Sequence, residues 1–162
     1  MKLSDGVEWS VHCCSVLGAL PEGTSVSGSH LAEFHGVPAA YLAKHLQALG
    51  AAGIVRSSPG RRGGYSLARP ADEVTLLDIV LAVEGDERAF RCTEIRRRGP
   101  SGLDDSCYAD ACGIAVAMRN AEDAWRASLA AVSLGDLVAS LDESVHPDQM
   151  ERAVDWLGKV VR

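Results

Sequence analysis

Three cysteines in a polar stretch of the chain are well placed to do chemistry. Cys92, Cys107 and Cys112 lie within residues 85–112, a segment rich in glycine, proline, serine and aspartate. The first two are separated by 14 residues and the last two by four. Structural zinc sites favour paired C-x-x-C knuckles, which are absent here, and three thiolates leave a four-ligand site one short. The spacing therefore indicates reactive thiols or a metal site that needs a further ligand.

The other two cysteines stand in a different setting. Cys13 and Cys14 belong to residues 6–20, GVEWSVHCCSVLGAL, which are apolar on most faces of a helix. Cysteines among apolar helical neighbours usually act as small hydrophobic residues of the core. We therefore expect both thiols to be buried and to bind no metal.

Glu8 and His12 are polar side chains on this same apolar helix. Residues at i and i+4 project from one face, so the carboxylate and the imidazole are neighbours. From the residues alone, an ordinary carboxylate–imidazole pair on a helix surface is the favoured interpretation, and a pair of metal ligands is the alternative. Trp9, between them, is either a core residue or a reporter of changes at the pair.

Turn and capping residues divide the chain into a series of elements. We expect short strands at 54–57 and 65–68. Helices are expected at 6–20, 29–36, 38–50, 113–131 and 147–161. Ser29 is the expected cap of the second helix, and two further helices are expected to start after Thr75 and after Ser133. Three helices followed by a hairpin are typical of a winged helix-turn-helix. The fold class predicted is mainly α with a small β-hairpin wing, followed by a long C-terminal helix.

Positive charge is concentrated in the segment that contains the recognition helix and the wing. Residues 37–71 hold five lysines and arginines and no acidic residue, although the chain carries a net charge of −6. Such a segment fits a polyanion, because each neutralised phosphate releases condensed counterions. A solvated basic face is the alternative, but the order of elements favours double-stranded DNA. The predicted contacts are Tyr41 and Lys44 on the recognition helix, and Arg56, Arg61 and Arg62 on the wing.

The long helix predicted at 113–131 has an apolar stripe. Ile114, Met118, Trp125 and Leu129 recur close to heptad spacing, which favours packing along another helix. A homodimer joined by this helix would bind two half-sites related by a two-fold axis, hence a pseudo-palindromic operator. Packing within one subunit is the alternative.

Composition places the chain among ordinary globular proteins. Hydrophobic residues make up 47% and charged residues 23%, and no apolar run is long enough to span a membrane. The N-terminal MKLSDGVEWS does not resemble a secretory signal. A cytoplasmic location is therefore expected, where cysteines are thiols or metal ligands more often than disulfides.

Several of these motifs together resemble the IscR/NsrR family of bacterial transcriptional regulators. The stretch YLAKHLQALGAAGIVRSSPGRRGGYSLARP resembles the recognition helix and wing of that family, and TLLDIVLAVEG, the three later cysteines, the long helix and SLGDLV follow in the same order. The resemblance implies a dimeric regulator, expected to be a repressor. Many members of the family carry a 2Fe-2S cluster and change their DNA affinity with the state of the cluster, so the same is expected here.

The motif GVEWSVHCC is similar to that of the redox-sensing RsrR branch of the family. This similarity implies cluster ligation by Glu8 and His12 of one subunit and by Cys107 and Cys112 of the other, with Trp9 linked to redox state. Cys92 matches the first cysteine of three-cysteine members, at a longer distance from Cys107.

The resemblance also suggests an organisation into three parts. Residues 1–84 would form the DNA-binding domain, 85–112 a cluster-binding loop, and 113–162 the dimerisation helix and C-terminal helices. The predicted function is redox-sensing transcriptional regulation, not catalysis. Two alternatives stay open: a winged-helix regulator that uses bare thiols or zinc, and a cysteine-dependent enzyme.

Overall fold

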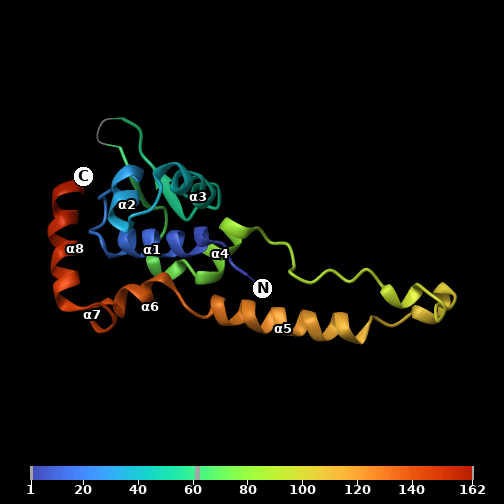
Figure 1. The fold of residues 1–162 in the computed structure, drawn as a ribbon. Helices are drawn as coiled ribbons and strands as arrows, with labels where there is room; N and C mark the ends of the chain where they lie inside the picture. Colours follow the sequence, from blue (N-terminus) through green and yellow to red (C-terminus); the bar gives the residue numbers. More distant parts are fainter. Residues whose placement is uncertain (1, 61–62, 162) are drawn as a thin grey trace. The chain divides into compact units, whose positions relative to one another are not determined.

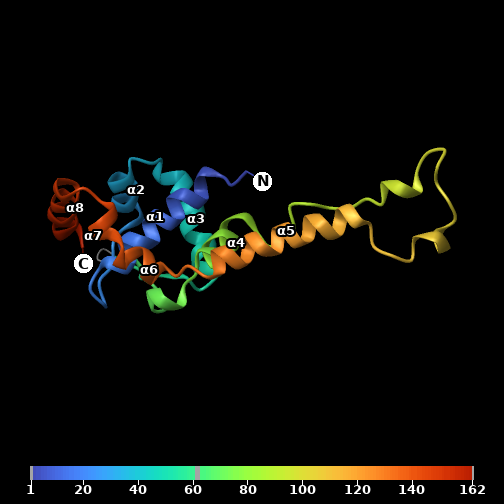
Figure 2. The same ribbon diagram turned by 90° about the horizontal axis from the view of Figure 1, so that it is seen from below.

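Two compact units make up the chain (Figure 1, Figure 2). The computed structural model describes residues 2–60 and 63–161. The larger unit comprises Lys2–Asp86 and Leu129–Arg162, and the smaller unit comprises Glu87–Ser128. Among the described residues, no helix combines the length and the apolar character needed to cross a membrane.

The larger unit begins with three helices, α1 (Asp5–Ala19), α2 (Gly28–His35) and α3 (Ala39–Ala51). The N-cap of α2 lies two residues earlier than the sequence predicts, because the hydroxyl of Ser27, not Ser29, accepts the backbone N–H of His30. It ends at Gly36, whose φ of 65° is a left-handed conformation that glycine adopts without strain. Pro38 then precedes α3, where the missing N–H costs no hydrogen bond.

Helix α3 turns one face to the core and the other to solvent. Leu42, Leu46 and Leu49 are buried at helical spacing. Each buried leucine side chain contributes roughly 1.5–3 kcal/mol to stability. The residues packed around them come from α1, α2, the wing and α4, and include Cys13, Cys14, Leu31, Ile54 and Ile79. The orientation of α3 is therefore set by the core, which leaves Tyr41 and Lys44 exposed.

The wing is a two-stranded antiparallel hairpin of β1 (Val55–Ser57) and β2 (Tyr65–Leu67). Val55 pairs with Leu67 and Ser57 with Tyr65, so both predicted strands are confirmed at nearly their predicted lengths. Tyr65 also exchanges backbone hydrogen bonds of 2.8 and 3.0 Å with Val26. The hairpin is thereby attached to the loop that precedes α2. Together these elements form the winged helix-turn-helix that the sequence predicts.

Two capping boxes lie against each other in the larger unit. Thr75 caps α4 (Leu76–Glu84) and Ser133 caps α6 (Leu134–Ala139), each with an aspartate three residues on. Thr75 and Ser133 also form an antiparallel bridge. The flanking backbones are joined by hydrogen bonds from Leu76 N to Val132 O, 3.0 Å, and from Leu134 N to Val74 O, 2.7 Å. The sequence predicts both caps, whereas their pairing is visible only in three dimensions.

The last helix packs on the helix-turn-helix. After the short elements η1 (Ala71–Glu73) and α7 (Leu141–Ser144), α8 (Pro147–Val160) lies beside α2 (Figure 1). The Trp156 ring centroid is 5.3 Å from that of Phe34 and 5.9 Å from that of His30. Val160 and Val161 pack against the core. The predicted tail helix is thus confirmed and covers α2.

The smaller unit consists of a loop segment and all but the last two residues of the long helix α5 (Gly113–Ala130). Two short 3-10 turns, η2 (Ile95–Arg97) and η3 (Asp105–Tyr108), interrupt the segment that the sequence predicts to be irregular. Glu122 of α5 is buried, pairs with Arg126 at 3.0 Å and accepts the backbone N–H of Ala89 at 3.2 Å. This carboxylate joins the start of the loop segment to α5.

Candidate metal centre and nucleic-acid interface

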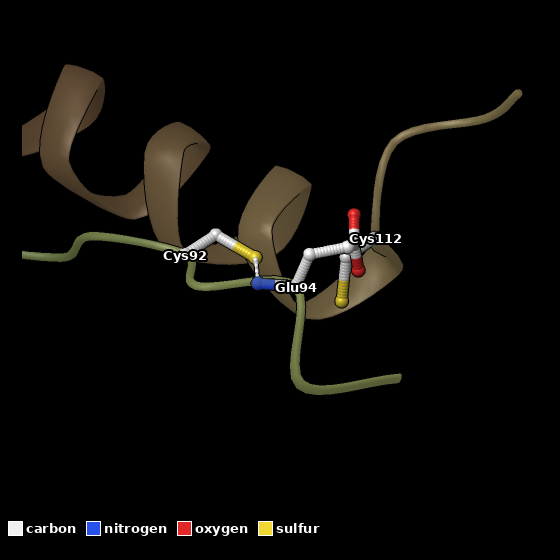
Figure 3. A group of neighbouring side chains, drawn as sticks. All are labelled: Cys92, Glu94 and Cys112. Atoms are coloured by element: carbon white, nitrogen blue, oxygen red, sulfur yellow. Dashed lines mark hydrogen bonds between the residues drawn. The ribbon is translucent and has the colours of Figure 1, made fainter. Parts of the chain in front are cut away.

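Cys92, Glu94 and Cys112 gather in the smaller unit (Figure 3). One ligand atom from each lies within 4.8 Å of the others, and the backbone N–H of Glu94 donates to Cys92 Sγ at 3.4 Å. Two sulfurs and a carboxylate oxygen form a donor set that suits zinc or an iron–sulfur centre. We call these three residues the thiol–carboxylate group.

The backbone at Glu94 adopts an unusual conformation that turns the chain back. Glu94 has φ 50°, and among the described residues it is the only non-glycine with positive φ. Such a conformation costs roughly 1–2 kcal/mol for an L-residue, so the surroundings must hold it. Arg96 does so with hydrogen bonds of 2.7 and 3.1 Å to the Glu94 carboxylate and one of 3.0 Å to the carbonyl of Asp110. Arg96 therefore connects the segment at Cys92 with the segment just before Cys112.

Tyr108 reinforces this connection. Its hydroxyl donates to the carbonyl of Arg96 at 2.9 Å and accepts the N–H of Leu103 at 3.0 Å. The guanidinium of Arg96 also lies 5.3 Å from the centre of the Tyr108 ring, within cation–π range. The loop that carries the candidate ligands is thus ordered by its own side chains.

Cys112 stands at the N-terminus of α5. The backbone N–H groups of Ala115 and Ile114 point at its sulfur and, with Arg96, hold the pKa of the Cys112 thiol below its ordinary value. The sulfur borders an open pocket of about 290 Å³. Its lining includes Arg88, Phe90, Cys92, Glu94 and Arg119. The surroundings of Cys112 therefore stabilise the thiolate form of its buried sulfur.

Cys107 lies elsewhere in the loop. It is an exposed residue of η3, and its backbone N–H donates to the carbonyl of Asp104 at 2.9 Å. The structure therefore brings Cys92, not Cys107, next to Cys112 within this chain. Sequence reasoning missed Glu94 and Arg96, although the run Cys-Thr-Glu-Ile-Arg, with a thiol and a carboxylate two residues apart, was a usable indication.

Glu8, Trp9 and His12 lie on α1 of the larger unit. Glu8 and His12 are exposed, and Trp9 is half-buried. Trp9 meets His45 of α3 edge-on, with ring centroids 6.1 Å apart, and His12 lies 5.7 Å from His35 at the end of α2. The helix that carries the predicted cross-subunit ligands therefore contacts both helices of the helix-turn-helix.

Cys13 and Cys14 are core residues, as predicted. Both side chains are fully buried. Burial raises the pKa of each thiol to about 12. Neither sulfur is available as a ligand or as a nucleophile at neutral pH.

The candidate DNA-binding surface combines α3 with the wing. Tyr41 is 67% exposed and Lys44 is exposed on the same helix. On the wing, Arg56 donates from Nε to the hydroxyl of Ser66 across the hairpin at 3.1 Å, which braces an exposed cation. Arg61 and Arg62, also predicted as contacts, lie outside the described residues.

Residues 3–140 match the Rrf2 family, described as "Iron-dependent Transcriptional regulator". The chain belongs to this family, and its likeness to IscR/NsrR regulators is confirmed. It is 31% identical over 160 residues to YffB of Lactococcus lactis, which is named an HTH-type transcriptional regulator, with 99% of each chain covered. The chain is therefore a DNA-binding transcriptional regulator by family and not an enzyme.

Solved structures show the same fold. The oxidised form of CymR from Staphylococcus aureus superposes with a TM-score of 0.63 at 25% identity, covering 85% of this chain and 96% of that one. IscR of T. potens superposes with a TM-score of 0.67 at 22% identity, covering 90% and 92%. The helix α8 lies beyond the residues that the family matches.

Proposed function

We propose that the protein is a homodimeric repressor that senses redox state through a 2Fe-2S cluster. The observation that carries the proposal is the thiol–carboxylate group. Its two sulfurs meet in a loop that internal hydrogen bonds already order, and one of them lies at a helix N-terminus. Iron–sulfur clusters are held by thiolates, with imidazole ligands in some centres, so the donors present fit such a group.

The proposed ligands come from both subunits. Cys112 is common to the ligand pair predicted from the sequence and to the observed group. The proximity of Cys92 to Cys112 favours Cys92 as the second thiol ligand, and Cys107 is the alternative. Glu8 and His12 of the partner subunit would complete the set, as the resemblance to the redox-sensing branch implies. When bound, a cluster with an imidazole ligand supplies a one-electron couple at a higher potential than an all-thiolate cluster.

A link from α1 to the DNA-binding surface supports the regulatory part of the proposal. Trp9 follows Glu8 directly and contacts His45 on α3, and His45 also packs against Gly6, where no side chain intervenes. A displacement of α1 at Glu8 therefore acts on the recognition helix through a side-chain contact. This is the path by which redox state would change DNA affinity.

The dimer rests on α5. Ile114 and Met118 are large apolar side chains, four residues apart on one face, that this helix exposes. A second copy of the chain that covers them would place two winged helices about a two-fold axis, which matches a pseudo-palindromic operator.

The ligand set is tested by anaerobic purification with iron, sulfide and visible-absorption measurements on single variants. Wild-type protein should be coloured, and Cys112→Ser should lose the chromophore. If Cys92 is the second thiol ligand, Cys92→Ser should lose the chromophore and Cys107→Ser should keep it. The reverse result would assign Cys107 as the ligand. His12→Ala should shift the reduction potential and uncouple DNA affinity from redox state. Imidazole nitrogen should appear in pulsed EPR of the reduced wild-type protein, and its absence together with an unchanged His12→Ala spectrum would exclude the mixed ligation.

A regulator that uses zinc or bare thiols is the second candidate. It is favoured by the fact that the thiol–carboxylate group forms within one chain, without residues of a partner. A colourless protein with stoichiometric zinc would support this candidate and contradict the cluster.

A further inference from the structure

We propose that Cys92 and Cys112 are a modification site: when no metal group occupies the loop, peroxide-class oxidants close this thiol pair into an intrachain disulfide. The inference extends the proposed function, because it assigns a second, two-electron response to the residues proposed as cluster ligands. It rests on the arrangement of the thiols and requires no cluster to be present.

Proximity is the first support. The sulfurs of Cys92 and Cys112 lie within 4.8 Å of each other although 19 residues separate them in the chain. A disulfide has an S–S length of about 2.0 Å, so side-chain rotation and a small movement of the loop at Cys92 can close the remaining gap. Among the described residues, the other exposed thiol, Cys107, belongs to no such group, and Cys13 and Cys14 are fully buried.

The order of the loop is the second support. Arg96 holds Glu94 and the carbonyl of Asp110, and Tyr108 holds the carbonyl of Arg96. These bonds keep the segment of Cys92 close to the segment of Cys112 without help from a metal. Folding of the loop therefore already brings the two sulfurs together, so formation of the disulfide loses little further conformational entropy.

Accessibility assigns the order of the chemical steps. Cys92 is exposed and borders the open pocket, whereas Cys112 is 8% exposed. The Cys92 thiolate attacks one peroxide oxygen, the O–O bond breaks, and the leaving hydroxide is protonated to water. Cys112 then attacks the resulting sulfenic sulfur, the S–O bond breaks, and a second water leaves with the Cys112 proton. Two thiols and one hydrogen peroxide give one disulfide and two waters, and the two electrons come from the sulfurs.

The disulfide would remove two thiols from the cluster-binding loop at once. Iron and sulfide could then not be inserted until a thiol reductant reopened the bond. After loss of the cluster, the protein would therefore stay in the oxidised, cluster-free form until it was reduced.

The test uses the full-length protein, stripped of iron with a chelator and treated with hydrogen peroxide. Mass spectrometry should show loss of two hydrogen atoms, and non-reducing peptide mapping should join Cys92 to Cys112. Cys107→Ser is the matched control and should form the same bond. Cys92→Ser should give a sulfinic or sulfonic product or no product, without an intrachain disulfide.

Recovery of the chromophore provides a second readout. After peroxide treatment, iron and sulfide should restore no colour until a dithiol reductant is added. A disulfide that involves Cys107, or progressive oxygen addition with no disulfide in the wild type, would overturn the inference. Failure of untreated, reduced protein to take up a cluster would contradict the proposed function alone, because peptide mapping requires no cluster.

Discussion

At the scale of single residues, burial and nearby hydrogen-bond donors together separate five chemically identical side chains into two classes. Cys13 and Cys14 lie in the apolar core, where the charged thiolate is penalised and the pKa rises to about 12. Cys92 and Cys107 are exposed, and Cys112 is held at a helix N-terminus. A thiol reacts as its thiolate, so these environments decide which sulfurs do chemistry.

The reactivity of the thiols towards an alkylating reagent tests this division. In reduced, metal-free protein at pH 8, we predict that Cys92 and Cys107 react at least about tenfold faster than Cys13 and Cys14. The reason is that the core thiols stay protonated below their raised pKa. Raising the pH to 9 should leave Cys13 and Cys14 protected, because pH 9 is still well below about 12. Peptide mapping by mass spectrometry measures each rate. In denaturant all five should react, and equal rates in the native protein would contradict the burial of the pair.

At the scale of elements, the paired capping boxes stabilise the junction of α4 and α6. Thr75→Ala removes a side-chain acceptor from the N–H of Asp78 and should lower the free energy of unfolding by about 1 kcal/mol. Ser133→Ala should cost about the same, by loss of the bond from Asp136 N. Because the two caps are bridged, the double variant should deviate from additivity.

Urea unfolding measures these effects, and Ser101→Ala at an exposed loop position is the control. Strict additivity of Thr75→Ala and Ser133→Ala would show that the bridge between the caps carries no coupling.

The recognition helix gives a second prediction at this scale. Lys44→Ala should weaken DNA binding and reduce the slope of log affinity against log salt by about one, because one phosphate contact is lost. Lys159→Ala on α8, an exposed lysine outside the basic segment, should change neither quantity. Fluorescence anisotropy with labelled operator DNA at several salt concentrations measures both. An unchanged slope for Lys44→Ala would remove this side chain from the interface.

At the scale of the whole molecule, the proposed dimer depends on α5. Ile114→Asp combined with Met118→Asp places two charges on its exposed apolar face and should convert a dimer into monomers, because buried charges without partners are strongly unfavourable. Asn120→Asp adds a charge at another exposed position of α5 and should keep the dimer. Sedimentation velocity measures the mass. A dimer that survives the double substitution would place the interface elsewhere.

Local signals in the sequence determined most of the elements. The caps Thr75 and Ser133, the glycine at 36 and the apolar spacing of Leu42, Leu46 and Leu49 predicted helix positions within about one residue, because capping and periodicity act over a few residues. The cap of α2 was misplaced since Ser27 and Ser29 are both competent acceptors, and only the backbone of the turn chooses between them.

Tertiary structure alone decided which candidate ligands meet. The sequence placed three cysteines in one polar loop, and the resemblance to the redox-sensing branch implied Cys107 and Cys112 as the ligands. The folded loop instead puts Cys92 beside Cys112, because Glu94 turns the backbone and Arg96 and Tyr108 hold the two distant segments together. Likewise the stacking of α8 on α2 and the contact of Trp9 with His45 depend on packing between elements. Separation along a chain does not measure distance in space. Residue types therefore predicted a candidate thiol or metal site, whereas long-range contacts decided which of the candidate residues lie together.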